Sequence, residues 1–281
     1  MYPILISGFA DEISSDFITQ LKSLKQLGIS YIALRSINGK NILDFTYEEF
    51  KKDVYPYLVE YDIHVSSIGS PIGKVKIDDE KNKMDQLKKF HELIKIMELV
   101  KTRYVRVFSL FVEDHSDASF SKVVQFFKEL LRAAQGKNVV ILHENEKDIY
   151  GDQAIYCKKI MKTLNHPQLK FAFDTANFVQ VGDDAMEAYL LLKEDIEYMH
   201  IKDAIKTTSE NVLIGQGNGY VKEITQNIIN SGYKGFFTLE PHLADFAYLN
   251  KLEINKSGRA KNSKPFEVFQ ATLEVFLKFI P

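Results

Sequence analysis

Residues 139–146 read VVILHENE, an apolar run that ends abruptly in His143, Glu144, Asn145 and Glu146. Residues 169–177, LKFAFDTAN, repeat the pattern, with Asp174 directly after an apolar segment. Near-continuous hydrophobicity over such short runs is typical of parallel strands that are covered on both faces. Both runs therefore predict buried parallel strands that carry polar side chains at their carboxyl ends.

Similar strand-like runs occur on both sides of these two segments. We predict eight strands, at residues 4–9, 31–36, 64–69, 104–109, 139–145, 169–174, 196–202 and 235–241. Segments of helical period lie between them, and successive strands start roughly 27 to 40 residues apart, the length of one βα unit. We therefore expect a single-domain (β/α)8 TIM barrel over residues 1–281, with residues 243–264 forming an extended loop before the last helix.

An open, doubly wound sheet is the alternative architecture, and it would carry a glycine-rich turn after the first strand. Residues 8–12 read GFADE there, which is neither a dinucleotide-binding fingerprint nor a P-loop. A glycine-rich segment, residues 215–219, comes only after the predicted seventh strand. We interpret it as a βα loop, and a phosphate cradle is the second interpretation.

Composition excludes several classes of protein. The chain of 281 residues has 36 basic and 38 acidic side chains, a balance that does not favour nucleic-acid binding. No apolar run reaches the ~18 residues of a membrane helix, and the N-terminus lacks the basic start of a secretory signal. Cys157 is the single cysteine, so no intrachain disulfide is expected. These features favour a protein of the cytoplasm.

Polar side chains at four consecutive predicted strand ends carry the functional interpretation: Glu144, Asp174, His200 and Glu240. In a barrel of this kind, strand ends and βα loops hold the reactive groups. Charges at such buried positions are costly unless they are compensated. Three carboxylates and an imidazole at one point call for a cation, and this ligand set suits Mn²⁺, Mg²⁺, Co²⁺ or Zn²⁺.

Each of these residues also has a structural interpretation when it is taken alone. Asp174 fits a helix cap, His200 fits a core histidine, and Glu146 and Asp203 fit salt-bridge partners. His143 should point away from Glu144 because side chains alternate along a strand. Packing and catalysis both stay open for His143, whereas the four residues taken together favour a metal site.

With this ordered series, the sequence resembles the xylose-isomerase-like TIM barrel superfamily, in its sugar phosphate isomerase/epimerase branch, over essentially the whole chain. The resemblance implies one divalent metal ion bound by Glu144, Asp174, His200 and Glu240. It also implies an acid/base pair formed by the two glutamates, as in the epimerase members. Two positions differ from the pattern. Asn177 stands where many epimerases have a substrate-contacting histidine, and Lys202 stands in place of an arginine.

Four cationic side chains lie at or just beyond predicted strand ends: Arg35, Lys74, Arg106 and Lys202. If they face the mouth of the barrel, they favour a substrate that carries phosphate or carboxylate. The alternative is that they balance nearby acids. With Asn177 and His242 they are the predicted substrate-binding residues. The expected partner is thus a small sugar, keto-sugar or sugar phosphate, and a homo-oligomer is compatible with the sequence.

The predicted function is isomerisation or epimerisation through proton abstraction next to a carbonyl group. A dehydratase of the inosose or dehydroshikimate type, or a hydroxypyruvate isomerase, would use the same ligands and stays open. An endonuclease IV-like nuclease would need further histidine ligands, which residues 66–69 and 108–109 do not supply. A sugar-binding barrel without turnover is the non-enzymatic alternative, and the presence of both glutamates argues against it.

Overall fold

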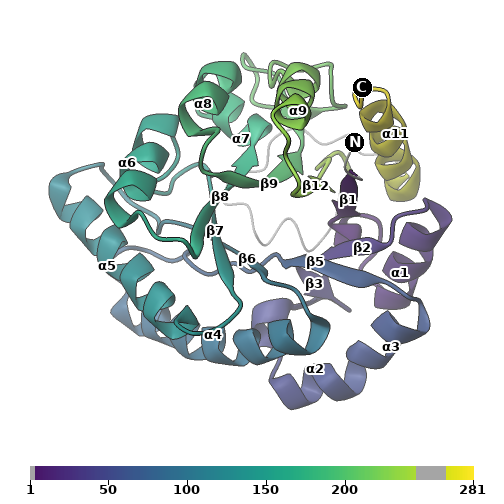
Figure 1. Cartoon of the computed structure of the whole chain (residues 1–281), viewed down its shortest axis with the longest axis horizontal. Coiled ribbons are helices and arrows are strands. Elements are labelled where there is room, and N and C mark those ends of the chain that lie inside the picture. Colours follow the sequence, from purple (N-terminus) through teal and green to yellow (C-terminus); the bar gives the residue numbers. More distant parts are fainter. Residues whose placement is uncertain (1–3, 245–263) are drawn as a thin grey trace.

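Eight parallel strands close into a barrel in the computed structural model, which describes residues 4–244 and 264–281 (Figure 1). The strands, in their order around the barrel, are β1 (Leu5–Gly8), β2 (Tyr31–Leu34), β5 (His64–Ile68), β6 (Tyr104–Val107), β7 (Val140–Glu144), β8 (Leu169–Asp174), β9 (Ile196–Ile201) and β12 (Phe236–Leu239). All of the neighbouring pairs are parallel, and β12 closes the barrel against β1. The predicted (β/α)8 barrel is confirmed.

Helices surround the strands as an outer ring (Figure 1). They are α1 (Phe17–Gln26), α2 (Tyr47–Asp53), α3 (Tyr55–Glu60), α4 (Glu80–Val100), α5 (Asp117–Ala134), α6 (Ala154–Leu164), α7 (Thr175–Gln180), α8 (Ala185–Leu192), α9 (Val221–Asn230) and α11 (Pro265–Leu277), with short 3₁₀ helices η1 (Ala10–Glu12) and η2 (Ile42–Asp44). Asp16, Asp79 and Ser116 start α1, α4 and α5 by accepting a backbone N–H three residues ahead. None of the helices in the described ranges has both the length and the apolar character that a membrane crossing requires.

Strand alternation places two sets of side chains on opposite faces of the barrel wall. Leu142, Ala172 and Tyr198 form a small buried cluster that is separate from the large core shared with the helices. Each of the three lies two residues before a predicted metal ligand on the same strand. Since side chains alternate along a strand, the ligands share the face of this small cluster.

Two short antiparallel hairpins extend the chain beyond β2 and β9, and neither was predicted. Strands β3 (Ser36–Ile37) and β4 (Lys40–Asn41) follow β2, and β10 (Asp203–Ala204) and β11 (Asn211–Val212) follow β9. The predicted extended loop at residues 243–264 lies almost entirely outside the described residues.

Candidate metal centre

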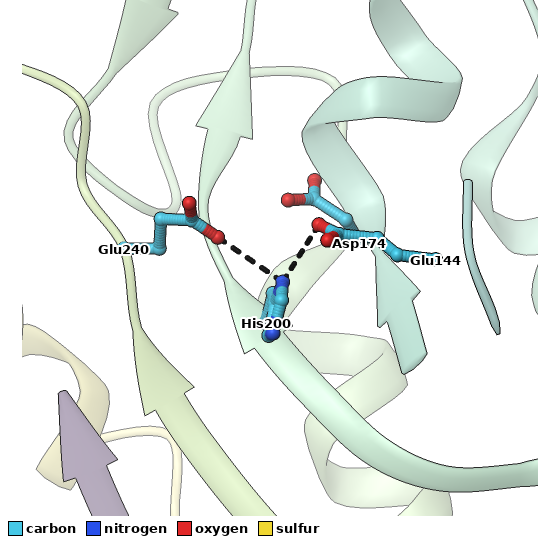
Figure 2. A group of neighbouring side chains, drawn as sticks. All are labelled: Glu144, Asp174, His200 and Glu240. Carbon is cyan, nitrogen blue, oxygen red and sulfur yellow. Dashed lines mark hydrogen bonds and ion pairs between the residues drawn. The ribbon is translucent and has the colours of Figure 1, made fainter. Parts of the chain in front are cut away.

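Four side chains from four adjacent strands meet at the carboxyl end of the barrel (Figure 2). Glu144 ends β7, Asp174 ends β8, His200 lies near the end of β9, and Glu240 directly follows β12. Each side chain is buried and offers one potential ligand atom, and these atoms all lie within 4.8 Å of one another. The structure therefore brings together the four residues that the sequence indicated as metal ligands.

His200 lies between the two glutamates. Its Nδ1 atom is 2.8 Å from Glu144 Oε1 and 3.1 Å from Glu240 Oε2. Figure 2 shows Glu240 on one side of the imidazole and Glu144 with Asp174 on the other. Burial alone would lower the pKa of His200, but the two carboxylates raise it to about 9. In this arrangement the imidazole is a cation that offsets part of the surrounding negative charge.

Asp174 is fixed by residues that follow β7 and β9 and by a residue of α7. Its Oδ1 atom accepts the backbone N–H of Asn177 at 2.9 Å, and its Oδ2 atom lies 2.9 Å from Lys202 Nζ. The side chain of Asn145 holds the Asp174 backbone through two hydrogen bonds of 3.0 and 2.9 Å. Lys202 also donates to Asn177 Oδ1 at 2.8 Å. Asn177 and Lys202, which were predicted to contact substrate, thus brace Asp174 in this structure.

The arginine nearest to each glutamate is a different one. Arg35 Nη1 donates to Glu240 Oε1 at 2.7 Å, and Arg106 Nη1 lies 3.2 Å from Glu144 Oε2. Both guanidinium groups lie against the ring of Phe9, at 4.4 and 5.2 Å from its centroid. The two arginines therefore fix the orientation of the glutamates.

The glutamates are ionised in this environment. Burial alone would raise the pKa of both carboxyl groups. His200 and Arg106 nevertheless bring the pKa of Glu144 below its ordinary value. Lys202 and His200 bring the pKa of Glu240 well below its ordinary value. Both side chains can therefore accept a proton at neutral pH.

Asp11 and Glu12, in η1 just after β1, belong to the same network but were not among the predicted site residues. Arg35 donates to Asp11 through two hydrogen bonds of 2.8 and 2.9 Å. Glu12 Oε2 accepts the backbone N–H of His242 at 2.8 Å, and His242 Nε2 lies 3.1 Å from Glu240 Oε1. Acidic side chains shortly after the first strand are a signal similar to the one that identified Glu144 and Asp174, so they could have been found.

Lys74 pairs with Glu146 at 2.8 Å. Burial would raise the pKa of Glu146, yet Lys74 and Lys202 lower it to about 2. All four cations at the predicted strand ends therefore have a carboxylate partner. Of the two alternatives left open by the sequence, this arrangement agrees with the one in which these side chains balance nearby acids.

Comparison with known proteins agrees with this fold. The family model for the xylose isomerase-like TIM barrel matches residues 21–260. The chain belongs to this family. No curated protein sequence matches the chain.

Solved structures of other proteins have the same fold at low sequence identity. A D-allulose 3-epimerase from Methylomonas sp. has a TM-score of 0.78 and 14% identity, over 99% of this chain and 98% of that chain. The IOLI protein with a bound zinc atom has a TM-score of 0.75 and 17% identity, over 99% of this chain and 98% of that chain. The probable 3-DHS dehydratase AsbF from Bacillus anthracis has a TM-score of 0.72 and 14% identity, over 98% of this chain and 99% of that chain. These likenesses show the fold of the family.

The glycine-rich loop of this xylose isomerase-like barrel, residues 215–219, surrounds a carboxylate of the chain itself. The N–H groups of Gly215 and Gly217 donate to Asp203 Oδ2 at 2.9 and 3.0 Å, and that of Gly219 donates to Oδ1 at 2.8 Å. A Cβ atom on Gly217 would lie 2.3 Å from Asp203 Oδ1, so only glycine fits there. Burial raises the pKa of Asp203, whereas these donors oppose the rise and favour the ionised carboxylate. The phosphate-cradle interpretation is corrected, because these donors are already bound.

We expect Asp203→Ala to lower the free energy of unfolding by about 3 kcal/mol, because backbone N–H groups lose their acceptor inside the protein. Asp203→Asn keeps one acceptor oxygen and should lose about half as much. Urea unfolding followed by circular dichroism measures both variants. Asp117→Asn is the control, since that side chain is 99% exposed. Equal unfolding midpoints for Asp203→Ala and the control would disprove this role.

His143 faces away from the centre, as strand alternation predicted. Its ring packs between Phe127 and Phe171, with centroids 5.3 and 5.5 Å away. Burial lowers the pKa of His143 to about 3, so the ring is neutral at physiological pH. Of the two roles left open by the sequence, packing is the one that this environment supports.

Proposed function

We propose that this protein is a divalent-metal-dependent isomerase or epimerase of a small carbohydrate, which moves a proton at a carbon next to a carbonyl group. The observation that carries the proposal is the placement of Glu144 and Glu240 on either side of His200 Nδ1, at 2.8 and 3.1 Å. Membership of the xylose isomerase-like family supports it. The fold shared with a D-allulose 3-epimerase and with a 3-keto-D-glucoside 4-epimerase from E. coli supports it further.

The cluster fits a divalent cation. Three of its oxygens, Glu144 Oε2, Asp174 Oδ2 and Glu240 Oε2, accept no hydrogen bond from the described residues. Each lies within 3.2 Å of a charged neighbour. Buried carboxylate oxygens are costly without a partner, and such oxygens with one imidazole nitrogen suit Mn²⁺, Mg²⁺, Co²⁺ or Zn²⁺.

Glu144, Asp174, His200 and Glu240 would hold the ion, which would stabilise the negative charge that develops on the substrate when a proton leaves. The remaining chemistry falls to the protein. Glu144 and Glu240 come from the ends of different strands and approach the imidazole of His200 from two sides (Figure 2). One carboxylate removes the substrate proton. The other takes up a proton from solvent beforehand and delivers it to the opposite face of the same carbon, and the first carboxylate then releases its proton to solvent. Arg106 and Arg35 hold the two carboxylates in register through the contacts described above.

Proton exchange with solvent tests the proposal directly. We expect the protein with Mn²⁺ in D₂O to incorporate deuterium next to the carbonyl of a keto-sugar, which NMR or mass spectrometry detects even when net conversion is small. The panel comprises keto-sugars, their phosphates and inososes. A protein that binds no metal and exchanges no proton with any member would be a sugar-binding barrel instead.

A dehydratase is the second candidate, because expulsion of a β-hydroxyl begins with the same proton removal. The shared fold of the probable 3-DHS dehydratase supports it. Loss of one water from the substrate, detected by mass spectrometry in the same assay, distinguishes a dehydratase from an epimerase.

A further inference from the structure

We propose that the substrate of this site is an uncharged sugar or cyclic polyol ketone, and neither a sugar phosphate nor a sugar acid. The inference rests on the proposed function and narrows its substrate class. Two separate features of the structure support it: the pairing of the cations around the metal centre, and the occupation of the glycine-rich loop.

The cationic side chains at the mouth of the barrel are paired with carboxylates of the chain. Arg35, Arg106 and Lys202 expose only 3%, 7% and 4% of their side chains, and each lies within 3.2 Å of a carboxylate oxygen. Lys74 is more accessible, at 17%, but it pairs with Glu146 at 2.8 Å. A phosphate group at this site would have to displace one of these partners.

The donor groups of the two arginines also face groups of the chain itself. Arg35 donates from Nε and Nη2 to Asp11 and from Nη1 to Glu240. Arg106 donates from Nε and Nη2 to the carbonyl oxygens of Ser70 and Gly69, at 3.4 and 3.2 Å, and its Nη1 faces Glu144. Bidentate recognition of phosphate or carboxylate needs two adjacent free N–H groups on one guanidinium. Arg35 offers no such pair in this arrangement, and the Nη1 group of Arg106 lies 3.2 Å from Glu144 and 4.0 Å from Glu240, so an anion there would meet both carboxylates.

Acids outnumber the cations in this network. The carboxylates paired with the four cations are those of Asp11, Glu12, Glu144, Glu146, Asp174 and Glu240. When His200 is a neutral ligand of the ion, the two charges of a divalent cation balance the excess of two acids over these four cations. A phosphate dianion beside these carboxylates would be repelled, and juxtaposed like charges cost several kcal/mol. Sugar hydroxyl groups, in contrast, donate hydrogen bonds to carboxylate oxygens.

The glycine-rich loop is the second feature. Barrels of this class frequently bind phosphate with the loops that follow the seventh and eighth strands. Here the loop after β9, the seventh barrel strand along the chain, directs three N–H groups at Asp203, at 2.8 to 3.0 Å. The carboxylate of Asp203 thus takes the place that a phosphate would need.

Deuterium exchange with matched substrates tests the inference. The probes are D-fructose and D-allulose against their 6-phosphates, and an inosose against 3-dehydroshikimate, each with Mn²⁺ in D₂O. We expect exchange with an uncharged member, with kcat/KM about 100-fold above that of its charged partner, which corresponds to about 2.8 kcal/mol. Equal or faster exchange of the charged member overturns the inference and leaves the proposed function intact. Absence of exchange with every probe contradicts the proposed function, and this inference with it.

A pair of variants tests the stated cause. Glu146→Gln releases Lys74 from its partner and should raise the kcat/KM of a 6-phosphate, relative to the uncharged sugar, about 10-fold, or about 1.4 kcal/mol. The double variant Lys74→Gln with Glu146→Gln restores the charge balance and should return the ratio to that of the native protein. An unchanged ratio in Glu146→Gln would show that ion pairing does not set the preference.

Discussion

Glu144→Gln and Glu240→Gln should each lower kcat by about 100- to 10,000-fold, the usual contribution of a general acid or base. The amide has the size of the carboxylate and keeps one oxygen for coordination, but it accepts no proton at neutral pH. Because the pKa of both glutamates is lowered, each resting side chain is ionised, and the substitution replaces this carboxylate by a neutral amide. The effect is measured by turnover and by deuterium exchange, with the substrate that the D₂O assay identifies. Thermal unfolding verifies that the variants are folded.

Glu146→Gln is the matched control for this pair. It makes the same chemical change two residues from Glu144, but Glu146 faces Lys74 and is not part of the metal cluster. Turnover of an uncharged substrate should therefore stay within about tenfold of the native value, well above that of either cluster variant. Native-like activity in Glu144→Gln or Glu240→Gln would refute the acid/base assignment.

Most of the fold was predictable because each barrel strand is a local apolar run that ends in polar residues. The strand predictions match the eight barrel strands, with differences of one or two residues where the chain leaves the sheet. The small hairpin of β3 and β4 was missed although its signal is local. Asn38 and Gly39 join the two strands with φ angles of 51° and 75°. An Asn-Gly pair is the strongest short signal for such a turn.

The site was predictable in its ligands and not in its supporting contacts. Four polar strand ends must converge in a closed barrel, so the meeting of Glu144 with the other ligands follows from the fold. The partner of each cation depends instead on which strands become neighbours. Arg35, just after the second strand, reaches Glu240, 205 residues away, because β12 closes the barrel next to β1, the neighbour of β2. Nothing local to Arg35 in the sequence carries that information.

Removal of the metal should abolish activity, and His200→Ala should weaken metal binding at least about 100-fold, since loss even of a group that only supports a ligand costs 10- to 100-fold. Treatment with EDTA followed by Mn²⁺ or Co²⁺ tests the first expectation. Elemental analysis and titration with Mn²⁺ test the second. Because an ion bound only by the folded state stabilises it, Mn²⁺ should also raise the Tm of the native protein, and this rise should vanish in His200→Ala.

His143→Gln separates ligation from general disruption of the barrel. His143 on β7 and His200 on β9 are both buried histidines near strand ends, but His143 packs against Phe127 and Phe171 on the outer face of its strand. We expect His143→Gln to unfold more readily while its metal content and Mn²⁺-dependent rise in Tm persist. Activity that resists EDTA, or equal metal loss in both histidine variants, would show that these four residues do not bind a catalytic cation. Glu144, Asp174 and Glu240 would then need another source of positive charge, since buried carboxylates this close together are not stable alone.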